Sequence, residues 1–330
     1  MTSVSSFFLI TAPLLSFVVT FVFILWLTKY SAVKILDHPN HRSLHTESIH
    51  RVGGVGLMLG VLVAWMLFPV VLPLSVWVGV YLLVLLSFSD DLFGLPVWMR
   101  LLVHCIAAVF LAAVLLFDTH GWLIVVIATI WIIWMSNLYN FMDGSDGLAG
   151  GMTLIGFSFY GLAALLGENE MFAMINFSIA SAAMAFLFFN FYPARVFMGD
   201  AGAIPLGFLA AVLGILGWID SLWPVWFPLL VFSPFIVDAS ATLAKRGLRG
   251  EKVWQAHREH YYQRLVKNGF GHRNTALLEY ILMLAVGASA MWAVQQEAMA
   301  QLGVGLAWSV VYLILIVVVG QYWRRGRSRR

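Results

Sequence analysis

The sequence has few charged residues. Only 11% of its 330 residues are Asp, Glu, Lys or Arg, whereas 62% are hydrophobic, and the mean hydropathy is +0.90. Soluble domains contain about one quarter charged residues, so the composition excludes a soluble protein and predicts a polytopic membrane protein. A hydrocarbon core about 30 Å thick needs roughly 20 apolar residues per helix, which leaves room for about ten or eleven helices.

Cysteine and strand-like alternation are also scarce. The one cysteine, Cys105, excludes an intramolecular disulfide and is expected to be a small buried apolar side chain. A membrane β-barrel would alternate apolar and polar residues, but the apolar runs here are continuous. The first run, 7–27, lacks a basic segment and an Ala-x-Ala cleavage site, so we expect a retained helix. The predicted fold class is an all-α polytopic membrane protein, with 1–330 as one integral membrane domain and no soluble module.

Hydropathy places about eleven transmembrane helices along the chain. Their expected ranges are 6–28, 54–73, 75–89, 99–117, 121–137, 148–166, 172–189, 203–219, 223–244, 275–294 and 303–322. All 19 Lys and Arg residues then fall in alternate loops and in the C-terminal tail, while the opposite loops carry acidic charge alone. Since Lys and Arg mark cytoplasmic loops, we expect a periplasmic N-terminus and a cytoplasmic C-terminus in a bacterial inner membrane.

The unusual polar clusters all fall in loops predicted on the cytoplasmic side. These loops lie near 29–53, 90–98, 137–151, 190–203 and 245–274. In the third of them, NLYNFMDGSDGLAGG, polar residues recur at intervals of three, at Asn137, Asn140, Asp143 and Asp146. That spacing puts them roughly on one face if the preceding helix continues through them. Clustered carboxylate and amide oxygens suit Mg²⁺, with Mn²⁺ as the alternative ion.

Two further acidic motifs lie at expected helix ends. Asp90 and Asp91 end the 75–89 helix, where negative charge opposes the helix dipole and the two carboxylates repel, so we expect a cation or a basic substrate region beside them. Asp200, in MGDAG, precedes an apolar run. A helix N-terminus with glycines is a ready anion site, which predicts phosphate binding there, although a plain N-cap is the simpler alternative.

The last long loop contains AHREHYYQRL at 256–265. Its histidines, His257 and His260, are possible Zn²⁺ ligands, but the oxygen-rich clusters and the distant cysteine favour Mg²⁺. Arg258 and Arg264 can hold phosphate oxygens through two nitrogens each. A plain interfacial basic loop remains the alternative.

Together these residues predict a Mg²⁺-dependent membrane enzyme that handles an anionic, diphosphate-like substrate at the cytoplasmic face. An ion-coupled transporter is the other class, because it also carries intramembrane acids. A transporter needs acids near helix midpoints that are reachable from both sides, whereas all the acids of these motifs map to one side.

The motifs, taken in order, resemble one family. Asp90–Asp91, NLYNFMDGSDGLAGG, FMGDAG and HREH look like the polyprenyl-phosphate N-acetylhexosamine-1-phosphate transferase superfamily, from Asp37 to about Arg273. Its members include the translocase that starts the peptidoglycan lipid cycle and enzymes that prime O-antigen and teichoic acid synthesis. The resemblance implies that undecaprenyl phosphate attacks the β-phosphate of a UDP-N-acetyl sugar, releasing UMP. The implied partners are these two substrates and membrane lipid, with no nucleic acid.

The resemblance also implies a role for each candidate residue. Asp90 would be the base or anchor for the lipid phosphate, with Asp91 beside it, and Asp143 and Asp146 would complete the catalytic acids around the nucleotide and metal. Asn140 and Asp200 would bind Mg²⁺. The implied substrate-binding residues are Asn137, Asn190, Phe197, Arg51, His257, Arg258 and His260, of which Asn190 and Phe197 would contact uracil and the last three the diphosphate and sugar.

Two departures from the family's motifs limit which UDP-sugar the chain is expected to use as donor. Ser48, Ile49, His50 and Arg51 stand where some relatives carry Pro-x-Pro-Arg, and HREHYYQRL replaces the longer histidine run of the peptidoglycan translocase. By resemblance, the segment from 235 to 263 favours the O-antigen-initiating branch, with UDP-N-acetyl-6-deoxyhexosamines as donors. A UDP-GlcNAc or UDP-GalNAc transferase is the alternative. The sequence leaves a homodimer open, because lipid-facing and partner-facing apolar helices look alike.

Overall fold

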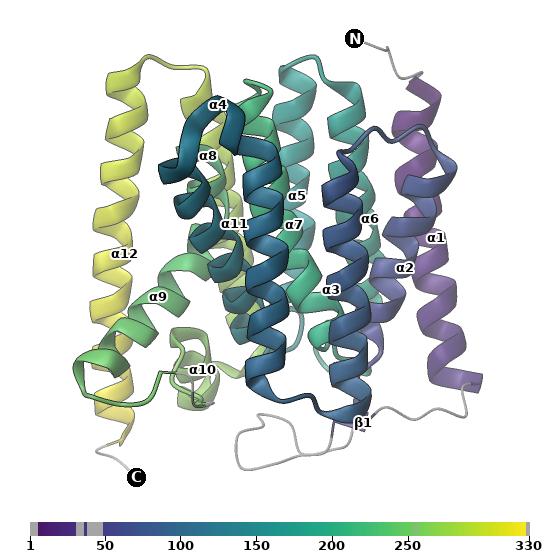
Figure 1. Ribbon diagram of the computed structural model, residues 1–330. Coiled ribbons are helices and arrows are strands. Elements are labelled where there is room, and N and C mark those ends of the chain that lie inside the picture. Colours follow the sequence, from purple (N-terminus) through teal and green to yellow (C-terminus); the bar gives the residue numbers. More distant parts are fainter. Residues whose placement is uncertain (1–5, 31–35, 38–48, 254, 256, 328–330) are drawn as a thin grey trace.

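The structure is a computed structural model that describes residues 6–30, 36–37, 49–253, 255 and 257–327. Helices make up nearly all of this part of the chain (Figure 1). They are α1 Ser6–Tyr30, α2 Gly53–Leu67, α3 Leu74–Phe93, α4 Val97–Met142, α5 Leu148–Leu166, α6 Glu170–Asn190, α7 Asp200–Ile219, α8 Trp226–Val231, α9 Ser233–Leu248, α10 Tyr261–Leu265, the π-helical turn η1 Val266–Phe270, α11 Gly271–Val294 and α12 Ala298–Arg327. The all-α fold class is confirmed.

A short strand pair precedes α2. Strand β1, Leu36–Asp37, runs antiparallel to β2, Ile49–His50. The peptide oxygen of His50 also accepts a 2.7 Å hydrogen bond from the backbone N–H of Phe197. This contact fixes the residue that follows β2, Arg51, beside the segment that leads into α7. Most of the predicted 29–53 loop lies outside the described residues.

Helix α4 consists of two arms, each long enough to cross a membrane, joined at a break. Its 46 residues would be about 69 Å long as a straight helix, far more than a bilayer core. The helix breaks at Gly121, whose φ of +73° suits glycine. Figure 1 shows the chain turning back at the top of α4. The two arms correspond to the predicted helices 99–117 and 121–137.

Every predicted helix range has a helical counterpart. Within the described residues, eight helices are long and apolar enough to cross a membrane, with α4 counted once, and α2 is a shorter apolar helix. The 54–73 prediction was too long, because α2 ends at Leu67, before Pro69 and Pro73. The range 223–244 is divided between α8 and α9. The exact number of spans and the orientation in the membrane stay predictions.

The two chain ends lie at opposite ends of the bundle, with α10, β1 and the C-terminus together at the bottom of Figure 1. Successive helices run up and down, so the motif-bearing ends of α3, α4, α6 and α9 reach this same end. The predicted cytoplasmic clusters are therefore brought to one end of the molecule.

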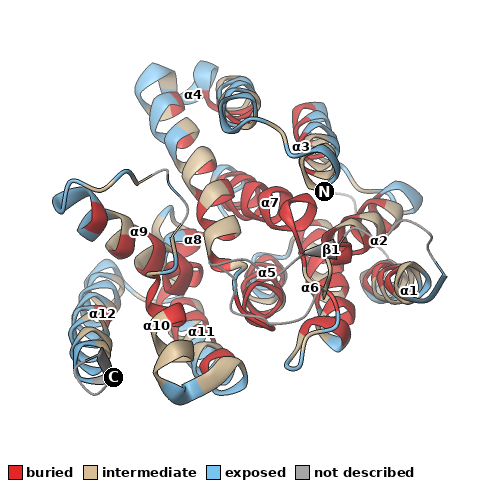
Figure 2. Ribbon diagram, turned by 90° about the horizontal axis from the view of Figure 1, so that it is seen from below, coloured by how far each residue is buried: buried red, intermediate tan, exposed pale blue. Residues whose placement is uncertain are grey.

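Helix α7 is the centre of the bundle and α12 its periphery. In their most apolar windows, 89% of residues are buried in α7 and 6% in α12. Figure 2, seen from the motif-bearing end, shows α7 buried among α2, α4, α5 and α6, with α12 set apart at the edge. The first residue of α7, Asp200, is thereby held in the middle of the bundle at this end.

Candidate active site

The acidic pair ends α3 in a fixed turn. Gly94, in the left-handed conformation, donates its N–H to the Asp90 carbonyl at 2.8 Å and ends the helix. The backbone N–H of Leu95 donates to Asp90 Oδ1 at 2.7 Å. The Asp90 side chain is thus held at the start of the connection to α4.

Asp91 lies at the N-terminus of α7. Its two carboxylate oxygens accept hydrogen bonds from the backbone N–H groups of Asp200, at 3.3 Å, and Ala201, at 3.0 Å. A helix N-terminus was predicted here as a phosphate site, but the anion that it binds in the structure is the chain's own carboxylate. Phosphate would have to displace Asp91 to take these donors.

Two arginines bridge the acids. Arg51 contacts Asp200 Oδ1 through Nη2 at 2.6 Å and Asp91 Oδ1 through Nε at 3.4 Å. Arg100 contacts Asp200 Oδ2 through Nη1 at 2.9 Å, and the same nitrogen contacts Asp90 Oδ2. Positive charge was expected beside Asp90 and Asp91 from a cation or a basic substrate region, and in the structure two arginines of the chain itself supply it. Arg100 was not among the predicted site residues.

Asp143 joins this cluster from the end of α4. Its Oδ2 accepts a 3.3 Å hydrogen bond from the backbone N–H of Gly199. Gly199 has a φ of +74°, and a Cβ there would lie 3.0 Å from Asp91 Oδ2, so the close approach needs glycine. Desolvation raises the pKa of Asp143 to about 8, the Asp200 and Asp91 carboxylates act in the same direction, and Arg51 opposes them.

The side-chain oxygens around Asp143 belong to amide and carboxyl groups, which are the ligand types that Mg²⁺ takes. Asn140 lies one helical turn before it, and its side chain makes no hydrogen bond to any residue that the structure describes. Asp90, Asp91, Asp143 and Asp200 bring carboxyl oxygens together around Arg51 and Arg100. However, both Asp200 oxygens contact arginines, and no three His, Cys, Asp or Glu side chains within the described ranges are arranged to hold a metal. Mg²⁺ commonly needs only one or two carboxylates together with substrate phosphates.

Asp146 and Asn190 hold two loops together. Asp146 Oδ2 accepts from the Ala194 N–H at 3.0 Å, and Asp146 Oδ1 lies 3.5 Å from His272 Nδ1. The Asn190 side chain accepts from the Gly147 N–H at 3.0 Å and donates to the Val196 carbonyl at 2.9 Å. Asn190 is buried and uses both ends of its amide on the backbone, so a contact with uracil would have to use the second N–H or the second lone pair of that amide.

Asn137 and Phe197 differ in how they face the cluster. Asn137 donates to the Ile133 carbonyl one turn earlier in α4, at 2.7 Å, which ties its amide to its own helix. Helix α4 ends at Met142, so the predicted single polar face holds for Asn137 and Asn140 but not for Asp146. Phe197 is half-buried in the segment before α7, where its carbonyl accepts from the Gly53 N–H at 2.9 Å.

The last loop is anchored by an acid that sequence reasoning missed. Asp238, buried in α9, accepts from the backbone N–H groups of Tyr261 and Tyr262, both at 2.9 Å, and lies 3.2 Å from His260 Nδ1. The Tyr262 hydroxyl donates to the Phe141 carbonyl at 3.1 Å, which attaches the loop to the end of α4. The only sequence signal for Asp238 was a lone acid inside an apolar run.

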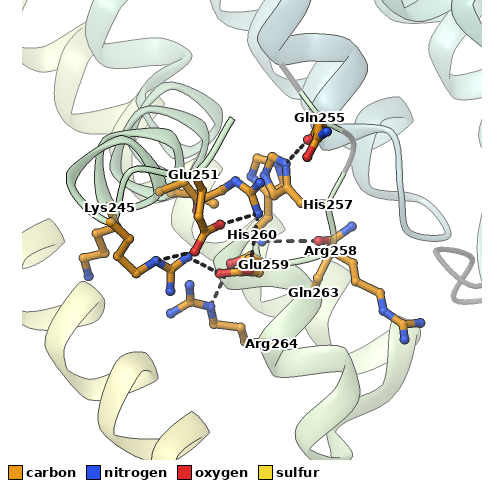
Figure 3. A network of polar contacts seen from close by, with 12 residues as sticks. Lys245, Glu251, Gln255, His257, Arg258, Glu259, His260, Gln263 and Arg264 are labelled. Carbon is orange, nitrogen blue, oxygen red and sulfur yellow. Dashed lines mark hydrogen bonds and ion pairs between the residues drawn. The ribbon is translucent and has the colours of Figure 1, made fainter. Parts of the chain in front are cut away.

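The predicted residues of this loop take different positions (Figure 3). His260 is buried, and its ring stacks on that of His257 with centroids 4.8 Å apart. Burial, together with His260, lowers the pKa of His257. Arg258 is exposed, and its guanidinium has no acidic partner among the described residues. The histidines stack rather than converge, which does not suit a Zn²⁺ site.

The comparisons with known proteins agree with these motifs. Residues 73–218, from α3 to α7, match the model of glycosyl transferase family 4. The chain is 26% identical to a probable undecaprenyl-phosphate N-acetylglucosaminyl 1-phosphate transferase of Bacillus subtilis, over 92% of this chain and 88% of the relative. It is 31% identical to a phospho-N-acetylmuramoyl-pentapeptide-transferase of Lacticaseibacillus paracasei, over 56% of this chain and 64% of the relative. A protein of the same description from Listeria welshimeri is 30% identical over 43% of this chain and 44% of its own length.

Proposed function

We propose that the chain belongs to the polyprenyl-phosphate N-acetylhexosamine-1-phosphate transferase superfamily and that it transfers a hexosamine-1-phosphate from a UDP-sugar to undecaprenyl phosphate and releases UMP. The observation that carries the proposal is the Arg100 bridge. One nitrogen of this guanidinium joins Asp90, the expected lipid-phosphate residue, to Asp200, the expected metal ligand. The two halves of the proposed reaction thus meet at one cation.

The proposed chemistry is mainly positioning and charge neutralisation. Phosphoryl transfer needs cations around the phosphates and an attacking oxygen held in line. Arg51, with a third of its side chain exposed, would contact diphosphate oxygens beside the acids. Arg100 would hold the lipid phosphate between the acids. Asp200 and Asn140, with Asp143 beside them, would hold Mg²⁺, which supplies charge neutralisation for the diphosphate.

Asp90 and Asp91 take different parts in this proposal. Asp91 is held by the N-terminus of α7 and by Arg51, so it would position the start of that helix. Asp90 contacts the connection after α3 and Arg100. It therefore remains the candidate base or anchor for the lipid phosphate.

For the donor, we propose an N-acetylhexosamine or an N-acetyl-6-deoxyhexosamine in a cell-envelope pathway such as O-antigen synthesis. The Bacillus subtilis relative is described as a probable N-acetylglucosaminyl 1-phosphate transferase, so UDP-GlcNAc is the first donor to test. The motif-bearing end would face the cytoplasm of the inner membrane, since that end carries the Lys and Arg residues.

The test is a UMP-release assay on the purified full chain with undecaprenyl phosphate, Mg²⁺ and a panel of UDP-sugars. We expect UMP from at least one UDP-N-acetyl sugar and none without the lipid. A matched pair of variants, Asp200→Asn and Asp220→Asn, changes the acids at the two ends of α7. Loss of turnover in the first alone supports the proposal, while no UMP from any donor would favour the transporter alternative.

A further inference from the structure

A basic pocket lies away from the acidic cluster, between α9–α10 and the end of α12. Its volume is about 1100 Å³. Its lining includes His257 and one acid, Glu259, and is otherwise rich in basic side chains, at Lys245, Arg249, Arg258, Arg264, Lys267 and Arg324. Figure 3 shows the α9 and α10 side of this cluster, with Lys245 to the left of Glu259 and Arg264 below it.

The cations are crowded within this pocket. Lys245 and Arg264 lie over the same ring, that of Tyr261, at 5.0 and 4.7 Å from its centroid. Arg249 contacts Glu259 at 2.6 Å, and Arg246, behind the pocket, contacts the same acid at 3.3 Å. Both arginines lower the pKa of Glu259 against its burial, so this acid is charged and already paired. Glu251 pairs with the same two arginines, at 2.8 and 3.0 Å, so the excess positive charge of the pocket comes from Lys245, Arg264 and Arg324.

An apolar groove continues from the pocket along α12. A neighbouring cavity of about 300 Å³ shares Lys245, Gly320 and Arg324 with the pocket and adds Ile316, Val317 and Gln321. The end of α12 is fixed there, because Tyr322 donates to the Asn268 carbonyl at 3.0 Å and packs edge-on against Phe270. A fixed basic pocket therefore opens onto an apolar strip of a helix that is largely exposed on the bundle surface.

We propose that this pocket binds the phosphate headgroup of an anionic phospholipid, with an acyl chain along the groove on α12. Basic pockets between membrane helices at the cytoplasmic surface suit anionic headgroups. The pocket is too large for one inorganic phosphate, and the groove would be unused by a soluble anion. The carrier lipid is the other phosphate-headed amphiphile, but under the proposed function its phosphate must reach Asp90 on α3, across the molecule from α12 (Figure 2).

The test measures binding, so it can fail without affecting the proposed reaction. The detergent-solubilised full chain is titrated with fluorescent phosphatidylglycerol and then challenged with unlabelled phosphatidylcholine, phosphatidylglycerol, undecaprenyl phosphate or inorganic phosphate. The variant Lys245→Gln/Arg324→Gln removes two lining charges. The control, Lys252→Gln/Arg325→Gln, removes two charges from the same two segments at residues that do not line the pocket.

We expect phosphatidylglycerol to compete and phosphatidylcholine to fail. Each lining charge should contribute about five-fold to affinity, from about 1 kcal/mol per basic residue, so the double variant should bind roughly 25-fold more weakly. The control should stay within about two-fold of the original chain. If the double variant does not fold, Arg324→Gln alone, at an exposed position, should still lose about five-fold.

Four results would overturn the proposal. Equal competition by phosphatidylcholine, or an equal loss in the control, would mean general attraction to the membrane surface. Tighter displacement by undecaprenyl phosphate would assign the pocket to the carrier lipid. Displacement by inorganic phosphate but by none of the lipids would assign the pocket to a soluble anion.

Discussion

Replacement of Arg100 tests the bridge at the centre of the site. Arg100 Nη1 contacts both Asp90 and Asp200, whose side chains are 9% and 7% exposed. Arg100→Gln removes the cation and leaves two nearly buried carboxylates adjacent to each other. Each lost charge-assisted hydrogen bond costs about 2 kcal/mol, so the variant should be destabilised by a few kcal/mol. Loss of one group that stabilises charge in the transition state should lower kcat by roughly 100-fold to 1000-fold.

Arg100→Lys sharpens the test. Because a single nitrogen of Arg100 makes both contacts, the ammonium group of lysine can replace it in part. We expect Arg100→Lys to keep activity within about ten-fold of the original, well above Arg100→Gln. The assay is UMP release, with thermal unfolding in detergent measured in parallel.

The matched control is Arg195→Gln. Arg195 also lies at the motif-bearing end, but it donates to the Phe188 carbonyl and lies over the Phe189 ring instead of bridging acids. Its replacement should leave kcat within about two-fold. Near-normal kcat in a folded Arg100→Gln protein would refute the reasoning, as would equal losses in the two glutamine variants.

Four further outcomes are expected. Asp200→Asn should abolish transfer in a folded protein, whereas Asp220→Asn, at the far end of α7, should keep it in the same assay. Asp238→Ala removes the acceptor that holds the last loop, so KM for the UDP-sugar should rise by about ten-fold with a smaller change in kcat, and a larger kcat effect would contradict an anchoring role. Asn190→Ala should lower the free energy of unfolding by about 2 kcal/mol, measured by denaturation, since it leaves two backbone groups unpaired. A tag placed after the C-terminal tail should be inaccessible from outside intact cells, and labelling from outside would reverse the proposed orientation.

The fold was predictable because a membrane helix can be recognised from local composition, as a continuous run of apolar residues. The range 148–166 matches α5, since charged or glycine-rich segments bound it on both sides. The two arms of α4 were separated correctly because Gly121 lies at their junction. The 54–73 range failed at its end, where apolar residues continue between two prolines although the helix stops at Leu67.

The site was predictable only in part, because contacts across the bundle leave little trace in local sequence. Asp90, Asp91, Asp143 and Asp200 are brought together as their shared side of the membrane suggested. In the sequence, Arg100 counts only as one of the positive charges that set the topology, although it joins Asp90 to Asp200, as Arg51 joins Asp91 to Asp200.

The role of a site residue could not be predicted from the sequence where the group that it contacts lies far away along the chain. Asn190 fits a substrate contact by motif, but its amide is paired with two backbone groups. His260 lies in a polar loop, yet it is buried against Asp238, and nothing in the sequence near His260 indicates that partner.

The most direct test follows the phosphorus atom. The purified chain is incubated with undecaprenyl phosphate, Mg²⁺ and a UDP-N-acetyl sugar labelled at the β-phosphate, and the lipid and water phases are separated. We predict that the label enters the lipid together with the sugar and that UMP appears in equal amount. Sugar in the lipid with the label retained in UDP would contradict the account, because the enzyme would then transfer the sugar without its phosphate.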